Sequence, residues 1–255
     1  MRALILAAGR GSRMRALTAQ QPKCLVPIDS RPLLEWQLES LRAAGIHQIG
    51  VVRGYQAAQI QPPDCALFEN PRWAETNMVA TLQRADAWLC AEECVISYSD
   101  ILYHPDTVAA LITAPEDIAI TYDQRWHELW KDRFADALSD AETFQSSSDG
   151  RLLAIGARAA TLSEVQGQYM GLLKFTPTGW DLITQYLHSL SPTRRDRLDM
   201  TSLLSALLQR GTTITTVPIQ GKWCEVDSDN DLALYESRIA AKTPWAHDWR
   251  WKEAA

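Results

Sequence analysis

RALILAAGRGSRMRALTAQQPKCLVP, residues 2–27, is the stretch of sequence that decides the fold. Apolar and small residues at positions 3–7 predict a strand that is buried on both faces, and the chain then turns at Gly9 and Gly11. Because glycine has no Cβ, this loop presents bare backbone N–H groups that can approach a phosphate closely. Arg13 and Lys23 follow and add positive charge. The combination predicts a binding site for a nucleoside triphosphate.

Spacing excludes two other phosphate-binding loops. The sequence has no G-x-x-x-x-G-K-[ST] motif, and the pair Gly9 and Gly11 lacks the third glycine of the dinucleotide fingerprint. The distinctive feature is an ordered set: LAAGRGSR at residues 6–13, PKCLVP at residues 22–27, and an amphipathic segment that begins at Pro32. This set resembles the nucleotidyltransferases that make activated sugars, cholines and related head groups from a nucleoside triphosphate and a phosphorylated acceptor.

The resemblance implies a set of nucleotide-binding residues and three catalytic ones. Lys23, Arg13 and Asp100 are the expected catalytic residues, with Lys23 placed against the phosphates to neutralise charge during transfer. The expected nucleotide-binding residues are Leu6, Ala7, Ala8, Gly9, Gly11, Ser12, Arg13, Lys23, Thr76, Asn77 and Ser99.

Strands and helices alternate along most of the chain. This rhythm predicts an α/β fold with a Rossmann-like, mainly parallel mixed sheet flanked by helices. The expected strands are 3–7, 48–52, 66–68, 95–98, 118–121, 169–175, 214–218 and 223–226. The expected helices are 32–45, 78–89, 106–112, 177–190, 200–208 and one from about 229, with a β-hairpin over 142–153.

Length and composition favour one domain. The 255 residues, 46% of them hydrophobic, suffice for a single large core. We expect one domain over residues 1–241, with an insertion at about 123–167 that covers the acceptor site, and a Trp-rich tail at 242–255. The formal net charge of −6 argues against nucleic acid as a partner, so an anion site must be a local cluster of positive charge.

The compartment and assembly follow from simpler features. The five cysteines show no C-x-x-C spacing, which indicates reduced thiols and no structural zinc site. The sequence has neither a signal-peptide pattern nor an apolar run of membrane-spanning length. We therefore expect a cytoplasmic protein that does not bind membranes and is a monomer or a homodimer.

Two aspartates are the candidate metal ligands. Asp100 and Asp227 each follow a buried strand, where a desolvated carboxylate is costly without a cation. In the family that the chain resembles, acidic residues in these places bind Mg²⁺, and Glu225 is a possible accessory ligand. One departure is Ser99, where the family commonly has glycine before the metal-binding aspartate. The expected cofactor is Mg²⁺.

A second group of motifs narrows the resemblance to the cytidylyltransferases for phosphocholine and phosphonates. The segment from Thr76 to Leu82 matches their T-N-x-x-x-x-L pattern, and DAE at residues 140–142, YMG at 169–171 and EVD at 225–227 also have counterparts. The expected reaction joins CTP to a small phosphorylated or phosphonylated, amine-bearing acceptor and releases pyrophosphate. A role in cell-surface polysaccharide or phosphonate biosynthesis is expected.

Aromatic and acidic residues in the insertion suggest how the acceptor is held. An organic cation is attracted both to aromatic faces and to carboxylates. The expected acceptor-binding residues are Asp123, Trp126, Tyr169 and Gly171, with Glu128 and Trp130 nearby. Trp126 and Trp130 also have helical spacing, so packing of the insertion onto the core is an equally good interpretation of both. The tail tryptophans Trp245, Trp249 and Trp251 are expected to dock on the body or on a second subunit.

Two other functions stay open at this stage. A sugar-1-phosphate nucleotidyltransferase that uses UTP, dTTP or GTP would share the first half of the chain, because the glycine loop binds phosphates and reads the base only in part. A non-catalytic nucleotide-binding regulatory subunit is the third hypothesis. The joint presence of Arg13, Lys23, Asp100 and Asp227 argues against it.

Overall fold

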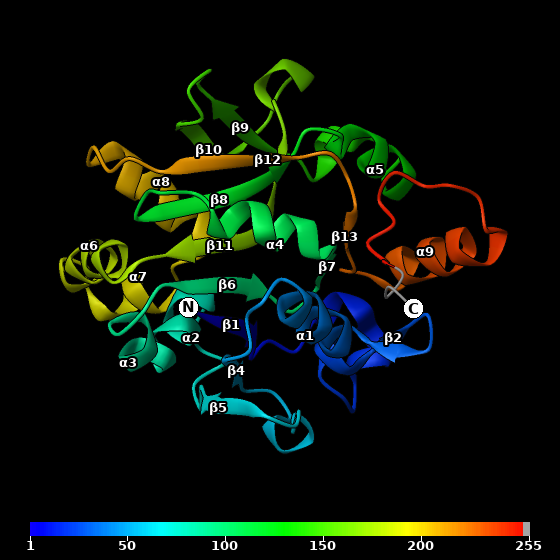
Figure 1. Cartoon of the computed structure of the whole chain (residues 1–255), viewed down its shortest axis with the longest axis horizontal. Helices are drawn as coiled ribbons and strands as arrows, with labels where there is room; N and C mark the ends of the chain where they lie inside the picture. The colour runs from blue at the N-terminus through cyan, green and yellow to red at the C-terminus, as the bar shows by residue number, and fades with distance from the viewer. Residues whose placement is uncertain (252–255) are drawn as a thin grey trace.

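A seven-stranded sheet forms the centre of the molecule, in the order β12-β8-β11-β6-β1-β4-β5 (Figure 1). The computed structural model describes residues 1–251. All neighbouring strands are parallel except β11, which is antiparallel to both β6 and β8, so the expectation of a mainly parallel mixed sheet is confirmed. The strands of this sheet are β1 (Arg2–Ala7), β4 (Ile49–Arg53), β5 (Cys65–Glu69), β6 (Cys94–Tyr98), β8 (Ile118–Asp123), β11 (Gln168–Phe175) and β12 (Thr215–Ile219).

Three small two-stranded sheets and nine α-helices complete the described chain of residues 1–251. The small sheets pair β2 (Pro27–Ile28) with β3 (Arg31–Pro32), β7 (Ile101–Tyr103) with β13 (Trp223–Glu225), and β9 (Glu142–Ser146) with β10 (Leu152–Arg158). The helices are α1 (Leu33–Ala43), α2 (Met78–Leu82), α3 (Asp86–Leu89), α4 (Pro105–Ile112), α5 (Trp126–Arg133), α6 (Pro177–His188), α7 (Pro192–Asp196), α8 (Met200–Gln209) and α9 (Asp229–Ala241).

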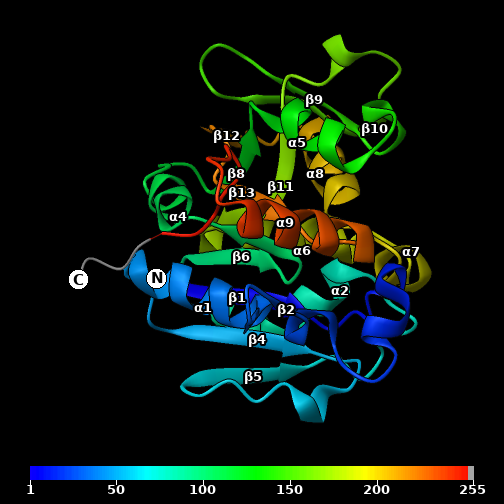
Figure 2. The same ribbon diagram turned by 90° about the vertical axis from the view of Figure 1, so that its right-hand side faces the viewer.

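Each face of the sheet has its own core. In β1 the side chains alternate, so that Ala3 and Ile5 pack with residues of α1 and α4 while Leu4 and Leu6 pack with residues of α2, α6 and α8. Figure 2 shows the two layers of helices on opposite sides of the strands. Because both faces of β1 are buried, its sequence is apolar without interruption from Ala3 to Ala7.

The carboxyl ends of β1, β4 and β6 lie at one edge of the sheet because these strands are parallel. The glycine loop follows β1, Gly54 follows β4, and Asp100 follows β6. A 3-10 helix over Ser12–Thr18 continues the glycine loop. The edge therefore collects the residues that the sequence singled out for phosphate and metal binding.

The insertion contains the expected hairpin of β9 and β10, together with α5. The expected single helix over residues 78–89 is instead broken into α2, a short 3-10 turn over Gln83–Ala85, and α3. Asp86, the first residue of α3, accepts a 2.8 Å bond from Nε1 of buried Trp180. This bond holds the second helical piece against α6.

All five cysteines carry free thiols in the structure. Within residues 1–251, no helix combines the length and the apolar character needed to cross a membrane.

The C-terminal tail lies on the body of the protein. Trp249 is fully buried and packs against Trp36 and Tyr235, with ring centroids 5.9 and 6.5 Å apart. His247 is also buried, and its Nε2 lies 2.8 Å from Oδ2 of Asp123 in β8. The last four residues of the expected tail segment, 252–255, lie outside the described part of the chain.

We predict that His247→Ala lowers the free energy of unfolding by about 3 kcal/mol at neutral pH, because it removes the side chain that bonds to Oδ2 of the buried Asp123 carboxylate. Burial raises the pKa of Asp123, but the hydrogen bond and charge of His247 outweigh it and the net pKa is lowered. A lowered carboxyl pKa stabilises the fold above the ordinary aspartate pKa of about 4 and stops doing so as the pH falls through the folded-state value. Urea unfolding followed by circular dichroism measures both effects.

The matched control is His47→Ala, which removes an exposed histidine and should leave stability unchanged. Equal stabilities of the two variants at neutral pH would contradict the role given to the His247–Asp123 pair.

Candidate active site

The glycine loop and Lys23 are shaped to fit each other. Gly11 has a φ of +69°, a left-handed conformation that favours glycine, and a Cβ on it would lie 2.7 Å from Cδ of Lys23. Thr18 Oγ1 donates a 2.9 Å bond to the Gly11 carbonyl and closes the loop. Glycine is therefore required here both by backbone angle and by the lysine that passes beside it.

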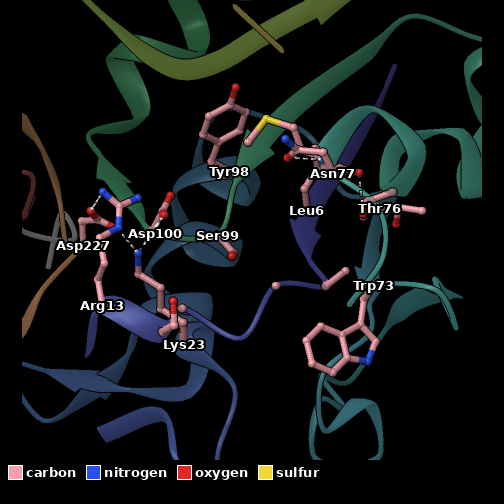
Figure 3. A pocket seen from close by; sticks show the side chains of 16 residues that line it. Leu6, Arg13, Lys23, Trp73, Thr76, Asn77, Tyr98, Ser99, Asp100 and Asp227 are labelled. Carbon is pink, nitrogen blue, oxygen red and sulfur yellow. Dashed lines mark hydrogen bonds and ion pairs between the residues drawn. The ribbon is translucent and has the colours of Figure 1, made fainter. Parts of the chain in front are cut away.

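Lys23 joins the two candidate metal ligands (Figure 3). Its Nζ donates 2.8 Å bonds to Oδ2 of Asp100 and to Oδ1 of Asp227, and only 7% of its side chain is exposed. Burial lowers the pKa of Lys23, but Asp100 and Asp227 together raise it by a larger amount. The net shift is upward, so the ammonium stays charged. Arg13 forms an ion pair with the other oxygen of Asp227.

Backbone pairing brings the two aspartates together. Asp100 follows β6 and precedes β7, Asp227 follows β13, and β7 pairs with β13. The Val226 N–H also donates a 2.8 Å bond to the Asp100 carbonyl. The two carboxylates therefore face the same point although they lie far apart in the sequence.

Asp100 and Asp227 fit a divalent cation. Oδ1 of Asp100 is buried and accepts no hydrogen bond from the described residues, so it is available to a cation. Residues 1–251 offer no third histidine, cysteine or carboxylate that would complete a cluster there. Mg²⁺ commonly binds to one or two carboxylates and completes its coordination with substrate phosphates and water. A pair of aspartates beside a phosphate-binding loop matches that preference.

One pocket runs from these charges along the glycine loop. Figure 3 shows Arg13, Lys23, Asp100 and Asp227 together at one end, with Trp73, Thr76 and Asn77 toward the other. Its lining residues are Leu6, Ala8, Gly9, Gly11, Ser12, Arg13, Lys23, Trp73, Thr76, Asn77, Met78, Thr81, Tyr98, Ser99, Asp100 and Asp227. Of the expected nucleotide-binding residues, Ala7 alone is not among them, because its side chain packs in the core.

A short loop holds Thr76 and Asn77 in this pocket. The buried side-chain amide of Asn70 donates to Oγ1 of Thr76 at 2.9 Å and to Oγ1 of Thr81 at 3.0 Å. Asn77 caps α2 by accepting a 2.8 Å bond from the Met78 N–H. The sequence did not predict four other residues of this pocket: Trp73, Met78, Thr81 and Tyr98. The dipeptide Asn70-Pro71 was the sequence feature that could have indicated an ordered loop here.

A second pocket adjoins the first and is acidic. The two pockets share Arg13, Met78 and Tyr98. The lining residues of the second are Arg13, Met78, Tyr98, Asp140, Glu142, Gly156, Gln168, Tyr169, Met170, Gly171, Asp199, Met200, Thr201, Ser202, Trp223 and Glu225. Among them are four carboxylates and one cationic side chain, Arg13, so the pocket favours a positively charged ligand group.

Tyr98 lines both pockets, and Tyr169 lines the second beside it. The rings of Tyr98 and Tyr169 meet edge to face with centroids 6.0 Å apart. Gly171 has a φ of +80°, and a Cβ on it would lie 2.4 Å from Cδ2 of Tyr98, so glycine allows the tyrosine to lie against β11. Tyr169 and Gly171, both expected acceptor-binding residues, do line the second pocket.

Two carboxyl groups of the second pocket, Glu142 and Asp140, have raised pKa values. Desolvation raises the pKa of Glu142, and the neighbouring charge of Asp199 raises it further. Desolvation likewise raises the pKa of Asp140, although the charges of Arg133 and Arg13 oppose it. A cation placed among these groups would relieve the repulsion between them.

Asp123 and Trp126 lie elsewhere than expected. Asp123 is fully buried, paired with His247, and its Oδ1 accepts bonds from the N–H groups of Arg125 and Gly221 at 2.9 and 2.8 Å. Trp126 is 4% exposed and donates from Nε1 to the Val165 carbonyl. Neither side chain lines the second pocket, and the packing interpretation of Trp126 is the one that the structure favours.

Glu225 faces the second pocket and is held by an arginine. Its Oε2 accepts a 2.9 Å bond from Nη1 of Arg133. Desolvation raises the pKa of Glu225, Arg133 lowers it, and Asp100 and Asp227 raise it again, so the net shift is upward. In the structure Glu225 is thus a partner of Arg133 beside the aspartate pair.

Comparison with known proteins places these features in context. The family described as a MobA-like NTP transferase domain matches residues 3–162. The chain is 37% identical to a CTP:phosphoglutamine cytidylyltransferase of Campylobacter jejuni over 253 residues, which cover 92% of this chain and 98% of that protein. It is 36% identical over 102 residues to a choline-phosphate cytidylyltransferase of Streptococcus pneumoniae, a match that covers 38% of this chain and 42% of that protein.

A solved structure shares the fold. The inositol-1-phosphate CTP transferase of T. maritima superimposes with a TM-score of 0.71, over 96% of this chain and 98% of that one, at 18% sequence identity.

We predict that Lys23→Met strengthens the binding of a divalent cation in the absence of nucleotide. The substitution removes the ammonium that bonds to Asp100 and Asp227, so one oxygen of each carboxylate becomes free to attract a cation while Arg13 keeps the other oxygen of Asp227. Titration with Mn²⁺, followed by electron paramagnetic resonance, measures the dissociation constant directly. Lys222→Met, which removes an exposed lysine paired with Asp106, is the matched control. Weaker or unchanged Mn²⁺ binding in Lys23→Met would show that the lysine and the metal do not share these carboxylates.

Proposed function

Because the chain belongs to the MobA-like NTP transferase family, we propose that it transfers a cytidylyl group from CTP to a small phosphorylated or phosphonylated acceptor and releases pyrophosphate. The cytidylyltransferase of Campylobacter jejuni, which is similar over nearly its whole length, supports CTP as the donor. Its acceptor is a phosphorylated amino acid, and that of the Streptococcus pneumoniae relative is a phosphorylated choline. We infer that the acceptor of this chain also carries a positively charged nitrogen.

The observation that carries this proposal is the pair of adjoining pockets. One holds the glycine loop and Lys23, which suit a triphosphate, and the other holds four carboxylates, which suit a cationic head group. Arg13 lines both pockets and is ion-paired with Asp227. An acceptor with its nitrogen among the carboxylates would have its phosphate near Arg13, at the boundary with the nucleotide pocket.

The reaction needs no protein nucleophile. An ionised oxygen of the acceptor phosphate or phosphonate attacks the α-phosphorus of CTP, a new P–O bond forms, and the bond to the β-phosphate breaks to release pyrophosphate. The barrier falls when the reactants are held in line and the charge on the phosphates is neutralised. Lys23, Arg13 and the backbone N–H groups of the glycine loop are the residues of this chain that would neutralise it.

We propose Mg²⁺ as the metal, held by Asp100 and Asp227. Nucleotidyltransferases of this family generally use a divalent cation, and the free Oδ1 of Asp100 supports a cation at this point. When bound, Mg²⁺ supplies charge neutralisation on the phosphates. Lys23 bonds to both aspartates, so its ammonium would leave them for the phosphates when substrate and metal bind.

A turnover panel tests the proposed function. The purified protein is assayed for pyrophosphate release with CTP, UTP, dTTP, GTP and ATP, each combined with choline phosphate, ethanolamine phosphate, 2-aminoethylphosphonate, phosphorylated amino acids and sugar 1-phosphates. We expect CTP with an amine-bearing acceptor to give the highest kcat/KM. A sugar 1-phosphate with UTP, dTTP or GTP as the best pair would contradict the proposal and support a sugar-nucleotide enzyme instead.

We predict that Glu142→Gln raises the KM for an amine-bearing acceptor about tenfold, since a contact to a charged group contributes roughly 1.5 kcal/mol. The pKa of Glu142 is raised, so in the wild type the acceptor KM should fall as the pH rises through that pKa and the side chain ionises. The variant should lose this pH dependence and keep its KM for CTP. Steady-state kinetics at several pH values measures all three quantities.

The control for this experiment is Asp149→Asn, which removes an exposed carboxylate at the turn of the same hairpin. An unaltered acceptor KM in Glu142→Gln, or an equal change in both variants, would show that Glu142 does not contact the acceptor.

A further inference from the structure

Arg133 is a buried cation that has no part in the proposed reaction. It is the last residue of α5, and only 1% of its side chain is exposed. Its guanidinium lies 4.7 Å from the ring centroid of Trp130 and 4.9 Å from that of Phe134. A buried charge is costly unless it is fully paired, so its partners identify what it does.

Within residues 1–251, both ionic partners of Arg133 belong to the segment that carries Asp227. Nη1 donates to Glu225 at 2.9 Å, two residues before Asp227. Nε and Nη2 donate to the two oxygens of Asp231 at 2.8 and 3.2 Å, four residues after it. The arginine is thus hydrogen-bonded to residues on both sides of Asp227, a candidate metal ligand.

Asp231 connects Arg133 to the backbone of Asp227, because its carboxylate accepts hydrogen bonds from both. Its Oδ2 accepts bonds from the N–H groups of Asp227 at 3.0 Å and of Ser228 at 2.9 Å, and from Oγ of Ser228 at 3.0 Å. One carboxylate therefore fixes the arginine on one side and the peptide of Asp227 on the other. The carboxylate of Asp227 then meets Lys23, 2.8 Å away.

Docking of α5 onto α9 alone does not account for this arrangement. A second ion pair, between Arg238 of α9 and Asp132 of α5, joins the same two helices at 2.5 Å, and both of its side chains are partly exposed. This second pair has no contact with Asp227. Arg133 and Arg238 both link α5 to α9, but only Arg133 is connected to Asp227 through Asp231. Arg238 therefore serves as a control for the effect of helix docking alone.

We propose that Arg133 is a positioning residue, which holds Asp227 in the orientation needed to bind the metal beside Asp100. The inference rests on the proposed function, because it assigns a role to Arg133 in the metal site of that reaction. It also implies that α5, part of the insertion beside the acceptor pocket, sets the geometry of the metal-binding loop. Residues that orient metal ligands typically contribute about tenfold to a hundredfold in metal affinity or activity.

The test compares Arg133→Met, Arg133→Lys and Arg238→Met with the wild type. Each protein is saturated with CTP in the absence of acceptor, so that no transfer occurs, and titrated with Mn²⁺ by electron paramagnetic resonance. We expect Arg133→Met to raise the Mn²⁺ dissociation constant at least tenfold. Arg133→Lys, which keeps the charge but cannot pair with two carboxylates at once, should lie between Arg133→Met and the wild type, and Arg238→Met should match the wild type.

Two further measurements separate positioning from stability. Urea unfolding gives the stability of each variant. Kinetics measured at increasing Mn²⁺ concentrations, up to saturation, gives kcat and KM. We expect the turnover rate of Arg133→Met to recover in part as the Mn²⁺ concentration is raised. If Arg133→Met does not fold, Arg133→Lys and Asp231→Asn carry the test, and both should weaken Mn²⁺ binding.

A variant that loses stability but binds Mn²⁺ within twofold of the wild type would overturn the proposal and leave Arg133 as a helix-docking residue. An equal change of Mn²⁺ affinity in Arg238→Met would overturn it as well. Failure of the wild type to bind Mn²⁺ with CTP would instead contradict the proposed function, so the two failures are distinguishable.

Discussion

The contact of one ammonium group with two carboxylates is the interaction on which the rest of the structure depends. Lys23 lies 77 positions before Asp100 and 204 positions before Asp227, yet its Nζ bonds to both. Isolated, the buried charges of Lys23 and Asp227 would be costly; together with the partly buried Asp100 they compensate one another. The glycine loop, the end of β6 and the end of β13 must therefore meet, and this requirement places β1 beside β6 and pairs β13 with β7.

Much of this arrangement could be predicted from the sequence because it rests on local patterns. The apolar run of β1, the glycines after it and the strand that ends at Asp100 each have a signature that is visible within a few residues. Parallel strands then bring their carboxyl ends to one edge without any knowledge of long-range contacts. The fold class follows from these features, and most residues lining the pocket at the glycine loop follow from them together with the resemblance to nucleotidyltransferases.

The proposed acceptor pocket could be predicted only in part, because its residues come from separate elements. Glu142 lies on the hairpin, Asp199 caps α8, and Glu225 ends β13. Asp123 was the more attractive candidate by composition, since it stands beside tryptophans in the sequence. Its partner, His247, comes from the tail, and no local pattern indicates that this histidine contacts an aspartate 124 positions earlier. Pairing over such distances decides whether a carboxylate is structural or free to meet a ligand.

That long-range pairing also bears on the order in which the protein takes shape during synthesis. A nascent chain emerges from the ribosome N-terminus first, so β8 is exposed long before His247 has been made. Until then the Asp123 carboxylate lacks its contact with His247, and water is its best environment. The contact of His247 with Asp123, and with it the packing of the tail on Trp36 and Tyr235, can therefore form only after the C-terminal end of the chain has been made.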